Sequence, residues 1–116
     1  MIPFVVQEKQ PNYILVKWEG LNPGDLVGQW FPCPHYSDRT VTIDGTFDGA
    51  TVTMEGCLSL LQNPFQLVDP QGNAISTGAS KIESILESPY HLRPRVAGGS
   101  SPLIDVWLLC HTVSKS

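Results

Sequence analysis

The sequence predicts an all-β fold, an antiparallel β-sandwich or jelly roll with at most one short helical turn. Ten prolines and ten glycines divide the 116 residues into short segments, which is typical of strands joined by turns. Several segments alternate apolar residues with threonine, the pattern of a strand with one buried face. A chain of this size forms one domain and buries enough surface to fold without disulfides or metals.

The first core strand is predicted at residues 13–18. Here Ile14, Val16 and Trp18 fall on one face of an extended chain, because side chains in a strand alternate between two faces. The segment 22–24, Asn-Pro-Gly, then turns the chain. The pattern indicates a strand that packs one face on the core and ends at a tight turn.

Residues 1–12 are predicted to be an extended arm that precedes a single sandwich domain at residues 13–116. The arm carries two prolines and few charges, and such a segment is suited to adding to the edge of a neighbour's sheet. Ile2, Pro3 and Phe4 are therefore predicted to bind a partner. The N-terminus has neither the charged region nor the apolar run of a signal peptide, so we expect a protein that is not secreted.

The stretch from residue 40 to residue 56 is the most informative part of the chain. Val41 and Ile43 alternate with threonines, and Val52 and Met54 repeat the pattern after two Asp-Gly pairs. Asp-Gly between two alternating segments is a strong signal for a β-hairpin. We therefore predict two half-buried strands that pair with each other in antiparallel fashion.

A second hairpin is predicted around Asp69-Pro70-Gln71-Gly72-Asn73, which combines several strong turn formers. It follows two short apolar runs, at residues 58–61 and 65–68. Residues 81–87 have helical spacing but meet Pro89 almost at once, so they are expected to form one helical turn or an irregular strand.

Two more segments are expected to be extended or irregular. Residues 90–96 read as an extended segment. In residues 32–35, two prolines cannot donate to a sheet ladder, so this segment is predicted to lie at an edge or in a loop.

Residues 103–113 are predicted to be the longest strand. Leu103, Trp107 and Leu109 lie on one face, while the other face is also apolar. A strand that is apolar on both faces belongs in the middle of a sheet with material packed on each side. We predict that the second cover is an oligomer partner, that Trp107 lies in the contact, and that a trimer is favoured over a dimer.

Composition excludes two classes of partner. The formal charge is −4 and only 7 Lys and Arg residues are spread along the chain, whereas nucleic-acid backbones are bound by clustered cations. No segment approaches the roughly 20 apolar residues that cross a membrane. We therefore expect neither nucleic-acid nor membrane binding.

The sequence contains only weak candidates for a metal site or a catalytic site. Asp44 and Asp48 flank a turn, but Ca²⁺ takes six to eight oxygen ligands and no further acidic residue lies nearby in the sequence. Cys33 and His35 share a strand face, yet a structural zinc site normally shows two close ligand pairs. The other cysteines and histidines, Cys57, Cys110, His91 and His111, are isolated in the sequence. We predict three free cysteines, no metal, no cofactor and no catalytic residue, and hence no enzyme.

Aromatic and basic residues leave two alternatives open. One alternative concerns the tryptophans and tyrosines, at positions 18, 30, 107, 13, 36 and 90. They either stack on a glycan or fill the core and interfaces, and the second interpretation is favoured. Arg93 and Arg95 flank Pro94. They either protect a sheet edge or dock onto an acidic surface by paired hydrogen bonds, and they are predicted to bind a partner.

Two blocks of the sequence resemble small virion proteins of tailed bacteriophages. The first runs from Val41 to Gly56 and contains Gly45-Thr46-Phe47-Asp48-Gly49-Ala50-Thr51-Val52-Thr53-Met54-Glu55-Gly56. The second comprises Gln66-Leu67-Val68-Asp69 and Gly72-Asn73, then Tyr90-His91-Leu92-Arg93-Pro94-Arg95-Val96-Ala97-Gly98-Gly99, followed by an apolar strand. The resemblance covers about residues 40–109. The chain departs from the pattern after Gly56, where it continues Cys-Leu-Ser-Leu-Leu.

The resemblance implies a capsid decoration, or cement, protein that binds the major capsid protein on the outside of the shell and bridges its subunits. The implied location is the capsid surface of a virion assembled in the host cytoplasm. A tail, baseplate or fibre adaptor and a carbohydrate-binding module remain as alternatives.

Overall fold

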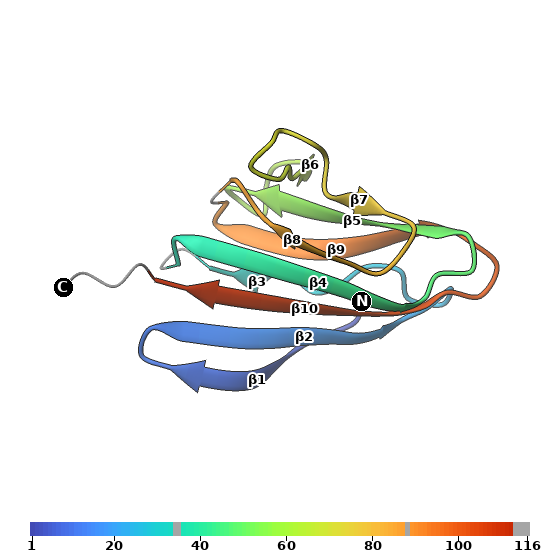
Figure 1. Cartoon of the computed structure of the whole chain (residues 1–116), viewed down its shortest axis with the longest axis horizontal. Coiled ribbons are helices and arrows are strands. Elements are labelled where there is room, and N and C mark those ends of the chain that lie inside the picture. Colours follow the sequence, from blue (N-terminus) through green and yellow to red (C-terminus); the bar gives the residue numbers. More distant parts are fainter. Residues whose placement is uncertain (34–35, 88, 113–116) are drawn as a thin grey trace.

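The computed structural model describes residues 1–33, 36–87 and 89–112. It is an all-β sandwich of two antiparallel sheets, with no helix among the described residues (Figure 1). The strands are β1 (Phe4–Gln10), β2 (Tyr13–Leu21), β3 (Phe31–Pro32), β4 (Asp38–Thr46), β5 (Ala50–Cys57), β6 (Phe65–Gln66), β7 (Ser76–Thr77), β8 (Lys81–Ser84), β9 (His91–Gly98) and β10 (Leu103–His111). The predicted fold class, a β-sandwich, is confirmed.

Each sheet contains strands from distant parts of the chain. The first sheet has the order β1-β2-β10-β4-β8, and the second has the order β3-β9-β5-β6, with β7 also paired to β5. The two layers are visible in Figure 1, where β2, β10 and β4 lie below β9 and β5. Both sheets bury one face against the other, and among the described residues no further layer covers either outer face.

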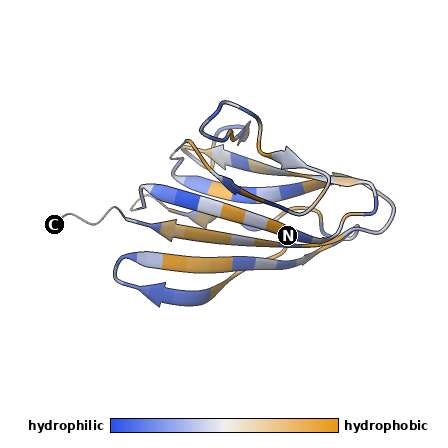
Figure 2. Cartoon of the chain, viewed as in Figure 1, coloured by the Kyte–Doolittle hydropathy of each residue, from blue (hydrophilic) through white to orange (hydrophobic). Residues whose placement is uncertain are grey.

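The core lies between the sheets and follows the alternation predicted from the sequence. Buried and less buried side chains alternate along β2, β4, β5 and β10. Figure 2 shows that β10 is hydrophobic over most of its length, so outward positions such as Leu109 are apolar as well. The largest fully buried side chains are Trp18, Leu21, Ile43, Met54, Leu92, Ile104, Leu108, Val16, Val41, Val52, Val96 and Val106. The indole Nε1 of Trp18 donates to the carbonyl of Gln29 at 2.9 Å, so its polar atom is also satisfied in the core.

Strand β10 occupies the middle of the first sheet, as its two apolar faces predicted. It pairs with β2 on one side and β4 on the other, so that Trp107 lies between Lys17 and Thr42. Its inner side chains, Ile104, Val106, Leu108 and Cys110, are fully buried. A strand in this position forms both hydrogen-bonded ladders of the sheet.

The predicted hairpin between β4 and β5 is wrong, although both of its strands are present. Strand β4 pairs with β10 and β8, whereas β5 pairs with β9, β6 and β7. Asp48 and Gly49 have positive φ values and the amide of Ala50 donates to the carbonyl of Phe47 at 2.8 Å. The turn therefore forms, but it carries the chain from one sheet to the other. Asp44-Gly45 lies inside β4, where it does not turn the chain.

The segment predicted as a separate arm belongs instead to the first sheet. Strand β1 pairs with β2 from Phe4↔Trp18 to Gln10↔Tyr13, and the Phe4 ring packs edge-on against Phe31 with 5.1 Å between centroids. The reason is local: Pro11-Asn12 is a two-residue turn that folds the segment back on the following strand. The sandwich therefore begins before residue 13.

The remaining segments follow the sequence closely. The turn at 69–73 closes as predicted, with the Asp69 carboxylate accepting from the amides of Gln71 and Asn73. Residues 81–84 form a strand, the second of the two alternatives for that segment. Pro32 lies in the short edge strand β3, and His35 lies outside the described residues.

Candidate interaction surfaces

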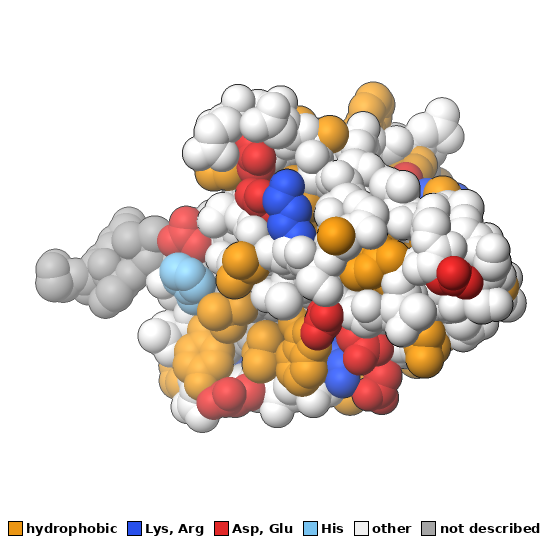
Figure 3. Space-filling view, turned by 45° about the vertical axis from the view of Figure 1, so that its right-hand side comes forward, with side chains coloured by type: hydrophobic (Ala, Val, Ile, Leu, Met, Phe, Trp, Pro, Cys, Tyr) orange, Lys and Arg blue, Asp and Glu red, His pale blue; other side chains and the backbone are white. Residues whose placement is uncertain are grey.

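The outer face of the first sheet carries an apolar patch across neighbouring strands. One cross-strand row runs Val5, Lys17, Trp107, Thr42, Ile82, and the next places Leu15 beside Leu109 and Thr40. Figure 3 shows hydrophobic side chains gathered over this sheet with acidic groups around them. Hence Trp107, predicted as a contact residue, lies on an outer face and not in the core.

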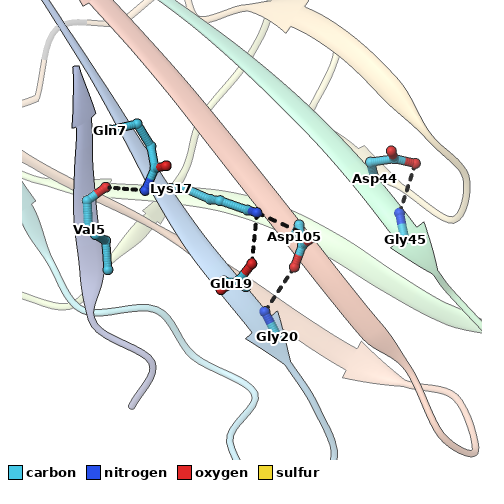
Figure 4. A network of polar contacts seen from close by, with 8 residues as sticks. All are labelled: Val5, Gln7, Lys17, Glu19, Gly20, Asp44, Gly45 and Asp105. Atoms are coloured by element: carbon cyan, nitrogen blue, oxygen red, sulfur yellow. Dashed lines mark hydrogen bonds and ion pairs between the residues drawn. The ribbon is translucent and has the colours of Figure 1, made fainter.

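The cation inside this patch is already paired. The Lys17 ammonium lies 4.5 Å from the centre of the Trp107 ring, 2.9 Å from Glu19 and 3.8 Å from Asp105. Figure 4 shows this network, in which Asp105 also accepts from the amide of Gly20. The hydrogen bond to Glu19 raises the pKa of Lys17, so the ammonium stays protonated at neutral pH.

The outer face of the second sheet is polar and is organised around Glu55. One oxygen of this carboxylate, Oε1, accepts from the Nε atoms of both Arg93 and Arg95 at 3.1 Å. The Arg93 guanidinium also lies 4.1 Å from the centre of the Trp30 ring. Two cations thus share one anion, and the Arg95 side chain is 44% exposed. Glu55 was not predicted as a site residue because a single acid in a strand gives no signal of its partners.

The three predicted contact residues of the N-terminal segment are held by the domain itself. The Ile2 amide donates to the carbonyl of Val27 at 2.9 Å, and the Ile2 carbonyl accepts from Gln29 at 2.7 Å. Ile2 and Phe4 are half-buried against the core, whereas Pro3 is exposed. Within this segment, the outer edge of β1 pairs with no other strand among the described residues, so it is the part that remains for strand addition.

A leucine-rich loop between β5 and β6 was not predicted as a site. Its large side chains are exposed, and the Leu61 side chain at its tip is 98% exposed. Hydrogen bonds from Gln62 N to Ser59 O at 3.1 Å and from Leu58 N to the Gln62 side chain at 2.6 Å define the turn. Three leucines within four residues, with no charge from residue 56 to residue 68, were the signal that a surface loop was present.

Two thiols and a buried guanidinium meet at one end of the core. The Nε of Arg39 donates to the Cys33 sulfur at 3.3 Å, and another nitrogen donates to the Cys33 carbonyl at 2.8 Å. The Cys110 thiol donates to the same sulfur, and this bond, with Arg39, lowers the pKa of Cys33 to about 7. Because it is the donor and is buried, the pKa of Cys110 is raised. The cysteines are free thiols in the structure.

The weaker candidates of the sequence separate in space. Asp44 binds Gly45 and Ser80, while Asp48 binds the amide of Ser101; no group of metal-ligating side chains occurs among the described residues. The three tryptophans do not form one platform, because Trp18 is in the core and the other two lie on opposite outer faces. Within residues 1–33, 36–87 and 89–112, no helix has the length and apolar character needed to cross a membrane.

Comparison with known proteins identifies no relative. No protein-family model matches the chain, and neither a curated protein nor a solved structure is significantly similar to it.

Proposed function

We propose that this chain is a non-enzymatic virion protein of a tailed bacteriophage that decorates the outer capsid surface. In this role it binds the major capsid protein and bridges neighbouring subunits. The proposal rests on the sequence resemblance of residues 40–109 and is supported by the surfaces of the sandwich. These surfaces are suited to contact with other proteins.

The observation that carries the docking proposal is the shared carboxylate on the second sheet. Glu55 neutralises only one of the two guanidiniums, so the Arg93–Arg95 face presents a positive charge on a chain whose formal charge is −4. Arg and Trp are the residue types that most often dominate binding energy at interfaces. An acidic capsid surface would pair with the Arg95 guanidinium, which is the more exposed of the two.

The leucine-rich loop supplies a candidate apolar contact beside this face. Cys57, where the loop begins, pairs with His91, where β9 begins. The loop and the start of the arginine strand therefore lie at the same end of the sheet. Many copies, each adding a modest contact, would stabilise a shell because all of them must be broken before it opens.

A sedimentation assay with shells of the major capsid protein tests this function. We expect wild-type protein to sediment with the shells and the Arg95→Glu variant to bind at least about tenfold more weakly, since it replaces attraction by repulsion. Lys9→Glu is the matched control, because it makes the same charge change on exposed β1 in the other sheet.

Three results would count against the proposal. Wild-type protein that stays in the supernatant would refute capsid binding, and equal losses in both variants would refute a specific role for Arg95. A few copies per purified particle, in place of hundreds, would support a tail or baseplate adaptor. The Trp30 ring is already covered by Arg93 on one side, which disfavours a glycan platform there.

A further inference from the structure

The two outer faces of the sandwich differ in a way that the single chain does not explain. The outer face of the second sheet presents Thr51, Thr53 and the Glu55 ion pairs, as expected for a face in water. The outer face of the first sheet presents Leu15, Trp107 and Leu109, with Ile82 67% exposed and Leu103 57% exposed at its margins. Monomeric soluble proteins rarely expose contiguous apolar patches of more than a few hundred Å².

We propose that two copies of the chain pack face to face through the outer surface of the first sheet, related by a two-fold axis. The occupant of the patch is thus a second copy of the chain. Such a dimer would form in the free protein with or without a capsid. Its test is therefore separate from the test of capsid binding.

The size of the face matches what a stable dimer needs. Five strands spaced about 4.8 Å apart give a width of roughly 24 Å. The nine residues of β2 and β10, at about 3.4 Å each, give a length of roughly 30 Å. The product, roughly 700 Å², is an upper limit because β1 has seven residues and β8 four; each copy therefore offers about 600 Å², at the lower end of the ~600–1,000 Å² per partner of standard interfaces.

The polar groups of the face permit its burial. An unpaired charge would cost several kcal/mol in a dry interface, but Lys17 is already held by Glu19 and Asp105. Its ammonium also lies against the Trp107 ring. Glu19 and Asp105 lie toward one end of β2 and β10, while Lys17, at the centre of β2 beside Trp107, is the ionised group within the apolar area formed by Leu15, Leu109 and Trp107. An apolar centre with a polar rim is the usual anatomy of an interface.

Charge decides the relative direction of the two copies. If β10 of each copy ran in the same direction, Asp105 would face Asp105 of the second copy. With the strands opposed and the axis between Leu109 and Trp107, Leu109 faces Trp107 and His111 faces Asp105 of the second copy. The opposed arrangement replaces a contact between two carboxylates by a contact between an imidazole, which can donate an N–H, and a carboxylate, so we assign it to the dimer.

Symmetry favours a dimer over the trimer predicted from the sequence. A patch that binds the same patch on another copy satisfies both copies at once and closes with two subunits. A three-fold ring requires the patch to bind a different surface of its neighbour. The second sheet offers the Glu55 ion pairs on its outer face, which do not complement a leucine and tryptophan surface.

Sedimentation equilibrium of purified protein, from micromolar to millimolar concentration, tests the dimer. We expect wild-type protein to be a dimer and Leu109→Glu to be a folded monomer, with a dissociation constant raised at least about a hundredfold, because each interface buries two new charges. Thr53→Glu, on the outer face of the second sheet, is the matched control and should remain dimeric. Leu15→Glu, at the cross-strand partner of Leu109, is the second variant if Leu109→Glu does not fold.

Several outcomes would overturn the proposal. A wild-type monomer or trimer throughout the concentration range would do so, as would equal weakening by Leu109→Glu and Thr53→Glu. A monomeric wild type that loses shell binding on Leu109→Glu would show that the capsid, and not a second copy, covers this face.

Discussion

Arg39 is a cation in the core, and its surroundings give Cys33 an unusual role. The side chain is 3% exposed, and its donors bind the Cys33 sulfur and the carbonyls of Cys33 and Glu87. A buried charge is costly unless it is paired. A thiolate at Cys33 would supply the opposite charge at hydrogen-bonding distance. The hydrogen bond from Cys110, and after it the hydrogen bond and charge of Arg39, lower the pKa of Cys33 against the opposing effect of burial.

The first prediction concerns the pH dependence of stability. The pKa of Cys33 is about 7 in the folded protein, against 9.0 for a free thiol. Between pH 7 and pH 9, Cys33 is largely a thiolate in the folded protein but still a protonated thiol in the unfolded chain. The free energy of unfolding should therefore rise with pH in this range, by up to about 1.4 kcal/mol per pH unit. Above pH 9 the trend should reverse, since Cys110, whose pKa is raised, keeps its proton only when folded. Denaturant unfolding at a series of pH values measures both limbs. A Cys33→Ala variant with an unchanged profile would contradict this assignment.

The second prediction compares two glycines with positive φ. At Gly45, with φ +126°, a Cβ atom would overlap the carbonyl oxygen of Leu103, whereas at Gly72, with φ +87°, nothing lies within 4 Å. We expect Gly45→Ala to destabilise the protein by about 3 kcal/mol and Gly72→Ala by about 1 kcal/mol. Thermal and denaturant unfolding of the two variants gives the comparison, and equal losses would show that the close approach in β4 has relaxed.

At the scale of elements, short-range patterns predicted the strands but not their partners. Alternation fixes which side chains are buried, so β2, β4, β5 and β10 could be placed from the sequence. Asp48-Gly49 predicted a turn because it favours positive φ, yet a turn does not specify whether its strands stay in one sheet. The positions of β4 and β5 are decided by their partners: β10 begins 57 residues after β4 ends at residue 46, and β9 begins 34 residues after β5 ends at residue 57. Local signals contain no information about such pairing.

In the candidate surfaces, too, individual residues could be predicted from the sequence but their contact partners could not. Trp107, Arg93 and Arg95 could be chosen from the sequence because their residue types and strand positions indicated an exposed face. Glu55 joins the arginines only through the register of β5 with β9. Arg39 lies beside Cys110 through the register of β4 with β10, and it meets Cys33, which follows β3, only where the two sheets pack together. These partners follow from tertiary structure, which the sequence pattern does not encode.

The third prediction concerns β1. Deleting residues 1–12 should destabilise the domain by about 2–4 kcal/mol, because it removes Phe4 from Phe31 and exposes the edge of β2. Phe4→Ala should reproduce much of this loss. Gln7→Ala should change stability by less than about 0.5 kcal/mol, since Gln7 is exposed at the bulge of β1. Thermal melting of the three variants is the measurement. A truncated protein with wild-type stability would show that residues 1–12 act as an independent arm.

At the scale of the whole molecule, the core protects all three thiols. Cys33 and Cys110 are fully buried and Cys57 is 2% exposed. Their reactivity is therefore limited by opening of the fold and not by the thiol alone. The rate at which these thiols are labelled therefore measures how often the sandwich opens.

The fourth prediction follows from this protection. In denaturant, three alkylations per chain should appear in the intact mass, whereas the native protein should react only as fast as it opens. Mass spectrometry at increasing labelling times measures the rates, and Gly45→Ala should label faster than Gly72→Ala. Immediate labelling of the native protein would contradict the burial of these residues. A mass two hydrogens lower before reduction would contradict the free thiols.

The central position of β10 also has a consequence for the order in which the fold can form. Residues 103–111 lie between residues 13–21 and 38–46 in the first sheet. During synthesis, the edges of β2 and β4 that pair with β10 therefore stay open until nearly 60 further residues after β4 have been made, although β1 is already available to the other edge of β2 and β8 becomes available to the other edge of β4. Pairing across such separations is slow, because a long loop must close before the contacts form. We infer that the β1–β2 hairpin is the first part of this sheet to form, and that pairing of β10 with β2 and β4 is the step that completes the sheet.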